Sequence, residues 1–156
     1  MFVKKIIAVI CPILVIGCFV WALFPFGESE IVTVPYEYPI KPGTTEWEGF
    51  LSREEMIEAC QIPEEILSRM TTDALVKTIL NYPMIFEMLI FETIDSDIDV
   101  GFWHIANSFN GLQELMGRED ALIVLEEYGD FSSMHDGNGI LAQIYRNVKH
   151  VQNNKE

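Results

Sequence analysis

Apolar side chains recur at intervals of three and four residues over most of the chain after residue 50, which is the period of an α-helix with one buried face. Two stripes show it most regularly: Leu75, Val76, Ile79 and Leu80, and then Ile140, Leu141, Ile144, Tyr145 and Val148. No convincing strand alternation occurs after residue 50. The pattern predicts an all-α domain over residues 50–152, a compact array of roughly six or seven short helices.

Helix boundaries are marked along this segment by capping residues and by proline and glycine. Ser52 and Glu55 form a capping box, in which the serine accepts from the backbone of Glu55 and the glutamate returns the bond. Pro83 marks the end of one helix and the start of the next. Gly129 marks the end of another helix. Because the predicted helices are short, we expect them to pack at varied angles.

The pattern changes at the N-terminus, where residues 6–24 carry no charged side chain. As a helix this run would reach about 28 Å, close to the thickness of a bilayer core. Lys4 and Lys5 precede it, so the positive-inside rule leaves the N-terminus in the cytoplasm. Residues 1–27 are therefore expected to form a single membrane anchor or signal segment, with the remainder outside the cytoplasm of a bacterial cell.

Two other modes of export stay open. Val15–Cys18 resembles a lipobox, which would make the protein a lipoprotein attached through Cys18. A cleaved signal would instead release a secreted form. Since six apolar residues follow Cys18, where a lipoprotein usually turns polar, the retained anchor is favoured.

Residues 28–49 contain three prolines and are predicted to form an extended tether. In polyproline geometry it would span up to about 68 Å. Tyr36, Tyr38 and Trp47 could instead dock on the domain, which would make the segment a strap. Residues 153–156 are expected to be a disordered tail.

Charge narrows the partner classes. The formal net charge is −14 and no Lys/Arg cluster occurs. Nucleic-acid binding is excluded on this ground, because it depends on a basic face that neutralises phosphates. The hydrophobic content of 49% excludes charge-driven disorder for most of the chain. The sequence does not determine an oligomeric state.

Cys60 is the only thiol after the apolar run, so no disulfide can form within the exported part. With His104, His135 or His150 beside it, Cys60 could serve as the nucleophile of an extracytoplasmic hydrolase or metal-dependent enzyme. No family signature surrounds it. A small buried thiol is the favoured interpretation.

Asp95, Asp97 and Asp99 alternate as in a calcium loop, but Val100 and Ala106 stand where the loop needs glycine and a bidentate glutamate. A solvated acidic loop or helix cap is favoured.

Ser132–Asp136 contains the residue types of a serine hydrolase, yet adjacent residues cannot converge as a triad does. The histidines lack zinc-ligand spacing. We predict no catalytic residue, no metal ligand and no cofactor.

Between about residues 60 and 130 the chain contains several distinctive segments: Ile62–Val76, Leu80–Pro83, Phe109–Leu115, Arg118, Asp120 and Tyr128. Asn81–Pro83 and Phe109–Gly111 are the most specific of them. Together they resemble an uncharacterised helical domain that recurs in exported proteins of anaerobic gut bacteria. This resemblance implies that the protein is exported and has an α-helical fold. It assigns no residue to a functional site. The retained membrane anchor expected here differs from that group, whose members are expected to have a cleaved signal or a lipid attachment. We interpret two of these polar positions, Asn81 and Asn110, as residues whose amides satisfy backbone groups at helix ends. We interpret the Arg118–Asp120 pair as a clamp on a helix start.

Together these features favour a non-enzymatic, membrane-anchored, extracytoplasmic helical domain that binds a surface protein partner. A purely structural role in an envelope assembly is a further hypothesis. The aromatic side chains to test for an exposed patch are Tyr36, Tyr38, Trp47, Phe102 and Trp103, and the alternative is that they pack into the core.

Overall fold

The computed structural model describes residues 30–90, 100–129 and 139–154. Several sequence predictions lie outside these ranges: the anchor with Cys18, the Asp95–Asp99 segment and the Ser132–Asp136 segment. In the part that is described, no helix is long and apolar enough to cross a bilayer. The contacts divide the chain after Glu30, and the unit that starts at Ile31 is described by itself.

The regular structure of the described residues is entirely helical, with nine helices and no strand. Five of the helices have seven residues or more. Their bounds are α2 Thr45–Glu48, α3 Arg53–Ala59, α4 Glu64–Leu67, α5 Thr72–Leu80, α6 Glu87–Ile90, α7 Val100–Ala106, α8 Asn110–Gly117, α9 Ala121–Glu126 and α10 Ile140–Asn153. The predicted all-α class is confirmed.

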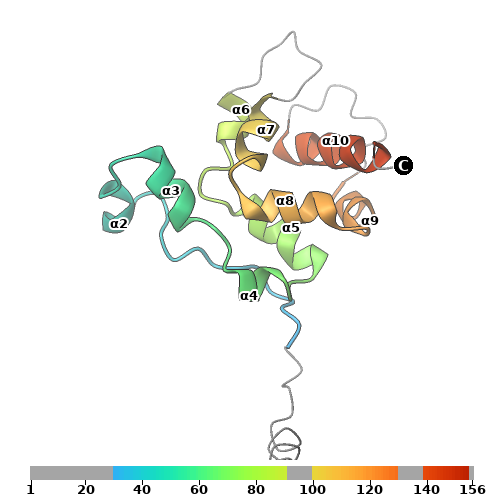
Figure 1. Cartoon of the computed structure of the whole chain (residues 1–156), viewed down its shortest axis with the longest axis horizontal. Coiled ribbons are helices and arrows are strands. Elements are labelled where there is room, and N and C mark those ends of the chain that lie inside the picture. The colour runs from blue at the N-terminus through green and yellow to red at the C-terminus, as the bar shows by residue number, and fades with distance from the viewer. Residues whose placement is uncertain (1–29, 91–99, 130–138, 155–156) are drawn as a thin grey trace, which may run out of the picture. The chain divides into compact units, whose positions relative to one another are not determined.

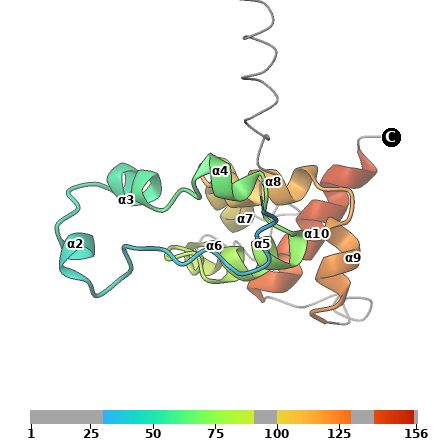
Figure 2. The same cartoon turned by 90° about the horizontal axis from the view of Figure 1, so that it is seen from below.

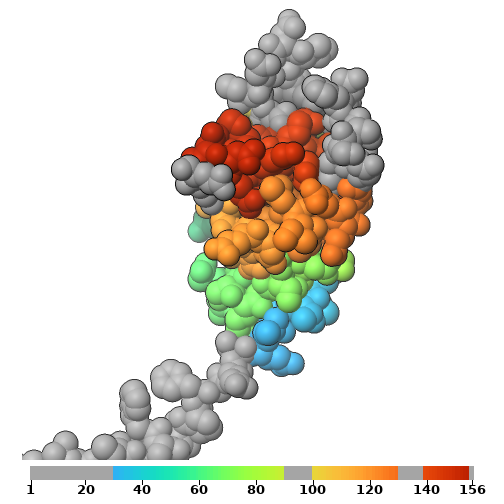
Figure 3. All heavy atoms as spheres, turned by 90° about the vertical axis from the view of Figure 1, so that its right-hand side faces the viewer, coloured from blue at the N-terminus to red at the C-terminus, as the bar shows by residue number. Residues whose placement is uncertain are grey.

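The core lies among five of these helices. Helix α5 packs against α8 and α9, while α10 packs against α7, α8 and α9 (Figure 1). The two most regular apolar stripes of the sequence belong to α5 and α10, and each helix turns its stripe toward this core. Figure 3 shows α10, the α8–α9 segment and the α4–α5 segment as successive bands on one face.

Helix starts follow the predicted capping chemistry, with one difference. The Ser52 hydroxyl accepts from the backbone N–H of Glu55 at 3.2 Å, as expected for the N-cap of α3. The Glu55 carboxylate, however, accepts from the N–H of Leu51 at 2.8 Å rather than from that of Ser52. Thr71 caps α5 by accepting from Ala74 at 3.3 Å. These bonds satisfy donors that the first helical turn leaves without partners.

Candidate interaction surface

The segment before α2 is attached to the helical domain. The backbone N–H of Val32 donates to Arg69 at 3.0 Å, and the Val32 carbonyl accepts from Thr71 at 2.9 Å. Farther on, the N–H of Tyr36 donates to the Thr78 hydroxyl at 2.8 Å. These bonds make residues 31–38 a strap along α4 and α5 (Figure 2).

The chain then leaves the core and returns to it, which creates a projecting arm that we define as residues 39–59. Tyr38 and Cys60 flank it, 2% and 0% exposed, and both belong to the hydrophobic core. Between them lie α2 and α3, neither of which contains a buried residue. In Figures 1 and 2 the two helices stand away from the α5, α8 and α10 group.

The returning end of the arm is fixed by side-chain amides. The Asn110 side chain accepts from the N–H of Ile62 at 3.0 Å and donates to its carbonyl at 2.7 Å. The Gln61 amide oxygen accepts from the N–H of Asn110 at 3.0 Å. This reciprocal set replaces the backbone bonds that the turn between α3 and α4 cannot make. The predicted structural role of Asn110 is thus observed.

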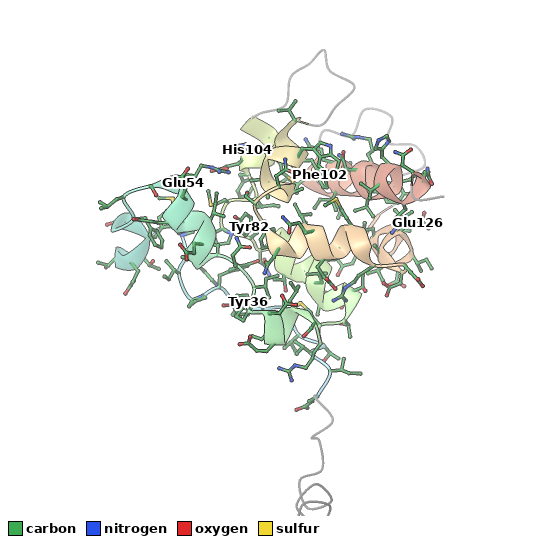
Figure 4. The ribbon with its side chains drawn as sticks, in the orientation of Figure 1. Tyr36, Glu54, Tyr82, Phe102, His104 and Glu126 are labelled. Carbon is green, nitrogen blue, oxygen red and sulfur yellow. The ribbon has the colours of Figure 1, made fainter. Side chains whose placement is uncertain are left out.

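A second attachment is electrostatic. The guanidinium of Arg53, the first residue of α3, donates to one carboxylate oxygen of Glu87 at 2.7 and 3.1 Å. The His104 Nε2 lies 3.6 Å from the same oxygen. Figure 4 shows His104 on the side of the body that faces α3, where Glu54 is labelled. The ion pair between Arg53 and Glu87 ties the start of α3 to α6.

The arm carries both apolar and acidic surface. Leu51 is 92% exposed. Trp47 and Phe50 meet edge to face, with ring centroids 5.9 Å apart. An open depression of about 330 Å³ is lined by Phe50, Glu55, Glu58 and Ala59.

The charge of the arm is unbalanced. Its two cations pair with carboxylates outside it, Lys41 with Glu37 at 2.8 Å and Arg53 with Glu87 at 2.7 Å. Five carboxylates are exposed along it, those of Glu46, Glu48, Glu54, Glu55 and Glu58. The arm therefore presents a negative potential beside its apolar groups.

Cys60, the thiol considered as a nucleophile, is not accessible in the part of the chain that the structure describes. Cys60 is completely buried, and burial raises the pKa of its thiol to about 11. At neutral pH the thiol is protonated and is a poor nucleophile. Among the residues that the structure describes, no three or more His, Cys, Asp or Glu side chains cluster as metal ligands.

The five aromatic residues singled out in the sequence do not form an exposed patch. Tyr38 and Phe102 are core residues. Tyr36, Trp47 and Trp103 are half-buried against the core. The interpretation as core holds for Tyr38 and Phe102, whereas the other three aromatic side chains pack at the edge of the core. The large exposed apolar side chains are others, above all Leu51 and Phe86. Sequence reasoning missed Leu51 because a single leucine before a capping box belongs to no apolar period.

Asn81–Pro83 and Phe109–Gly111, two segments singled out in the sequence, meet inside the protein. Tyr82 and Phe109 stack with their ring centroids 4.0 Å apart and their planes at 15°. Both rings are buried (Tyr82 is labelled in Figure 4). Burial also raises the pKa of the Tyr82 hydroxyl above its usual range. These pieces therefore build the core.

Arg118 acts as a clamp between helices. Its guanidinium donates to the carbonyls of Leu67 and Met70 and to the Thr72 hydroxyl. Thr72 in turn donates to the Asp120 carboxylate at 2.8 Å. Leu67 ends α4, Met70 lies in the connection between α4 and α5, and Thr72 starts α5. The group therefore joins the end of one helix and the start of the next to the α8–α9 turn, as the clamp prediction requires.

Comparison with known proteins adds no relative. No family model matches the chain, and no curated protein and no solved structure match it. Its function is therefore argued from its own residues.

Proposed function

We propose that the chain is a non-enzymatic helical domain, presented outside the cytoplasm and attached to the membrane, that binds a protein partner through the arm. One observation carries the proposal: the arm is rooted in the core at both ends, yet its two helices contain no buried residue.

The reason is energetic. Segments are held in a fold mainly by the apolar area that they bury, and a side chain such as leucine gains about 1.5–3 kcal/mol when it is fully buried. Leu51 gains almost none of this within the described part of the chain, since it is 92% exposed. The neighbouring Trp47 and Phe50 are only half-buried. An exposed apolar group beside a polar rim is typical of a surface that a partner covers.

Export and attachment are proposed from the sequence. The uncharged run of residues 6–24 behind Lys4 and Lys5 supports a retained helical anchor. Lipid attachment through Cys18 and secretion are the alternatives. Each of the three leaves the arm outside the cytoplasm.

The hydrolase alternative rests on Cys60 and is not favoured. A thiol nucleophile must reach its substrate and must ionise. Cys60 is sealed in the core, and the raised pKa of its thiol opposes ionisation.

The proposal is tested by site-specific photo-crosslinking in cells that contain the full chain. A benzophenone amino acid is placed at Leu51 or at Ile123, a matched position on α9 that is 66% exposed. We expect a discrete adduct from position 51 that does not form from position 123. Its protein component, identified by mass spectrometry and purified, should bind the L51D variant about tenfold more weakly than the parent chain or I123D, because buried leucine contacts carry one to a few kcal/mol.

Two results would contradict the proposal. Adducts that are the same from both positions would indicate contact without a defined surface. Failure of position 51 to crosslink would favour a purely structural role in an envelope assembly.

A further inference from the structure

Resting on the proposed function, we infer that the partner inserts a basic side chain, arginine or lysine, into the depression beside α3, next to an apolar contact with Leu51. The depression is lined by two apolar residues, Phe50 and Ala59, and by two carboxylates, those of Glu55 and Glu58. This lining is the complement of an aliphatic stem that ends in a cation.

The residues that line the depression come from one face of α3 and from the turn before it. Glu58 and Ala59 follow Glu55 by three and four residues, so the three side chains lie on the same face of α3. Phe50 belongs to the turn that leads into this helix, where its N–H donates to Trp47 at 3.3 Å. An aromatic residue, Phe50, and a residue with a small side chain, Ala59, suit a cation on an aliphatic stem.

The carboxylates of Glu55 and Glu58 can accept hydrogen bonds from a partner. Glu55 is held in position because its Oε2 accepts from the N–H of Leu51 at 2.8 Å. A carboxylate has about four acceptor sites, so further donors can be accommodated. Glu58 is exposed and takes part in none of the ion pairs found among the described residues. A guanidinium can donate to both carboxylates from one plane.

Charge selects against the other occupants. A second copy of the chain would bring the same acidic arm and the same net charge of −14. Nucleic acids and anionic lipid surfaces would be repelled in the same way. The arm's own cations cannot fill the depression without breaking their pairs with Glu37 and Glu87. A basic segment with a neighbouring apolar side chain would pair with the carboxylates of the arm and would also cover the exposed Leu51.

The test uses the purified full chain in a neutral maltoside detergent and a fluorescent peptide of alternating arginine, leucine and alanine. The comparison peptide has citrulline for arginine, which keeps the shape and removes the charge. By fluorescence anisotropy we expect the arginine peptide to bind about tenfold tighter than the citrulline peptide, with an affinity that falls as salt rises.

Two matched double variants distinguish binding at the depression from general attraction of the peptide by the negative charge of the protein. E55Q/E58Q is expected to weaken binding of the arginine peptide about tenfold, whereas E64Q/E65Q on α4, with the same change in net charge, should alter it less than about twofold. Glu64 and Glu65 are also exposed. A glutamine side-chain oxygen can still accept from the N–H of Leu51, so E55Q should keep α3, and circular dichroism checks this.

Equal effects of the two double variants, equal binding of the two peptides, or no binding of the arginine peptide would each overturn the inference. If position 51 still crosslinks one partner in cells, such a result leaves the binding function standing and removes only its basic specificity. Loss of that crosslink as well would remove both.

Discussion

Replacing Gly101 with alanine is expected to destabilise the fold by about 3 kcal/mol or more, because the added methyl group has no space. A Cβ at Gly101 would lie 1.8 Å from the carbonyl oxygen of Met88 and 2.6 Å from its carbonyl carbon. These are backbone atoms, which cannot rotate away as a side chain can. To accept the methyl group, α7 must move off α6.

The matched control is the same substitution at Gly117, the last residue of α8. A Cβ there would meet no atom within 4 Å. G117A should therefore be neutral or stabilising by up to about 1 kcal/mol, since alanine is the better helix former. Urea unfolding followed by tryptophan fluorescence measures both variants. Equal stabilities of G101A and G117A would show that α6 and α7 are not in this contact.

Arg118→Ala is the second change for which we expect a large loss, about 2–4 kcal/mol. The guanidinium donates to the carbonyl of Leu67, which ends α4, to the carbonyl of Met70 in the connection to α5, and to the Thr72 hydroxyl at the start of α5. These residues are buried, and in the variant the Leu67 carbonyl keeps only the N–H of Met70, at 3.2 Å, while the other two acceptors lose the donor that Arg118 provides. Each buried acceptor left without a donor costs about 1–3 kcal/mol where water does not reach it. Lysine has one donor group in place of a planar fork, so R118K should restore only part of the loss.

Lys41→Ala provides the comparison for the clamp. Lys41 pairs with Glu37 at 2.8 Å, but the two side chains are 50% and 75% exposed. Removing such a pair is expected to change the free energy of unfolding by less than about 1 kcal/mol. The same urea unfolding experiment applies. A loss in R118A no larger than that in K41A would mean that the Arg118 clamp does not hold α4 and α5.

The strongest periodic signals predicted the structure best. The stripes of α5 and α10 were assigned from spacing alone, and both helices carry them toward the core. The sequence also predicts the clamp by Arg118 and Asp120, because unpaired groups at helix ends require nearby polar partners. Four-residue helices such as α2 are too short to show a period, and α2 lies among prolines where the sequence predicted extended chain.

The candidate surface could be predicted only in part. The capping box predicts the start of α3. From their spacing, Met56 and Ile57 look like core positions, yet both are half-buried and α3 contains no buried residue. Periodicity alone does not show that a helix lies at the edge of a domain. The burial of Tyr38 was also beyond pattern analysis, since a lone tyrosine between prolines is fixed by contacts with residues far along the chain. Its hydroxyl donates to the carbonyl of Thr78 at 3.4 Å.

The most direct test of the central claim, an arm exposed outside the cytoplasm, is cysteine labelling at Leu51. Spheroplasts that carry the full chain as L51C are treated with a membrane-impermeant maleimide, and the parent chain is the control because Cys60 is buried. Cys11 and Cys18 lie in the apolar run and are unchanged in both chains. The account predicts that L51C is labelled while the cytoplasmic membrane is intact and that the parent is not. Labelling of L51C only after lysis would contradict it.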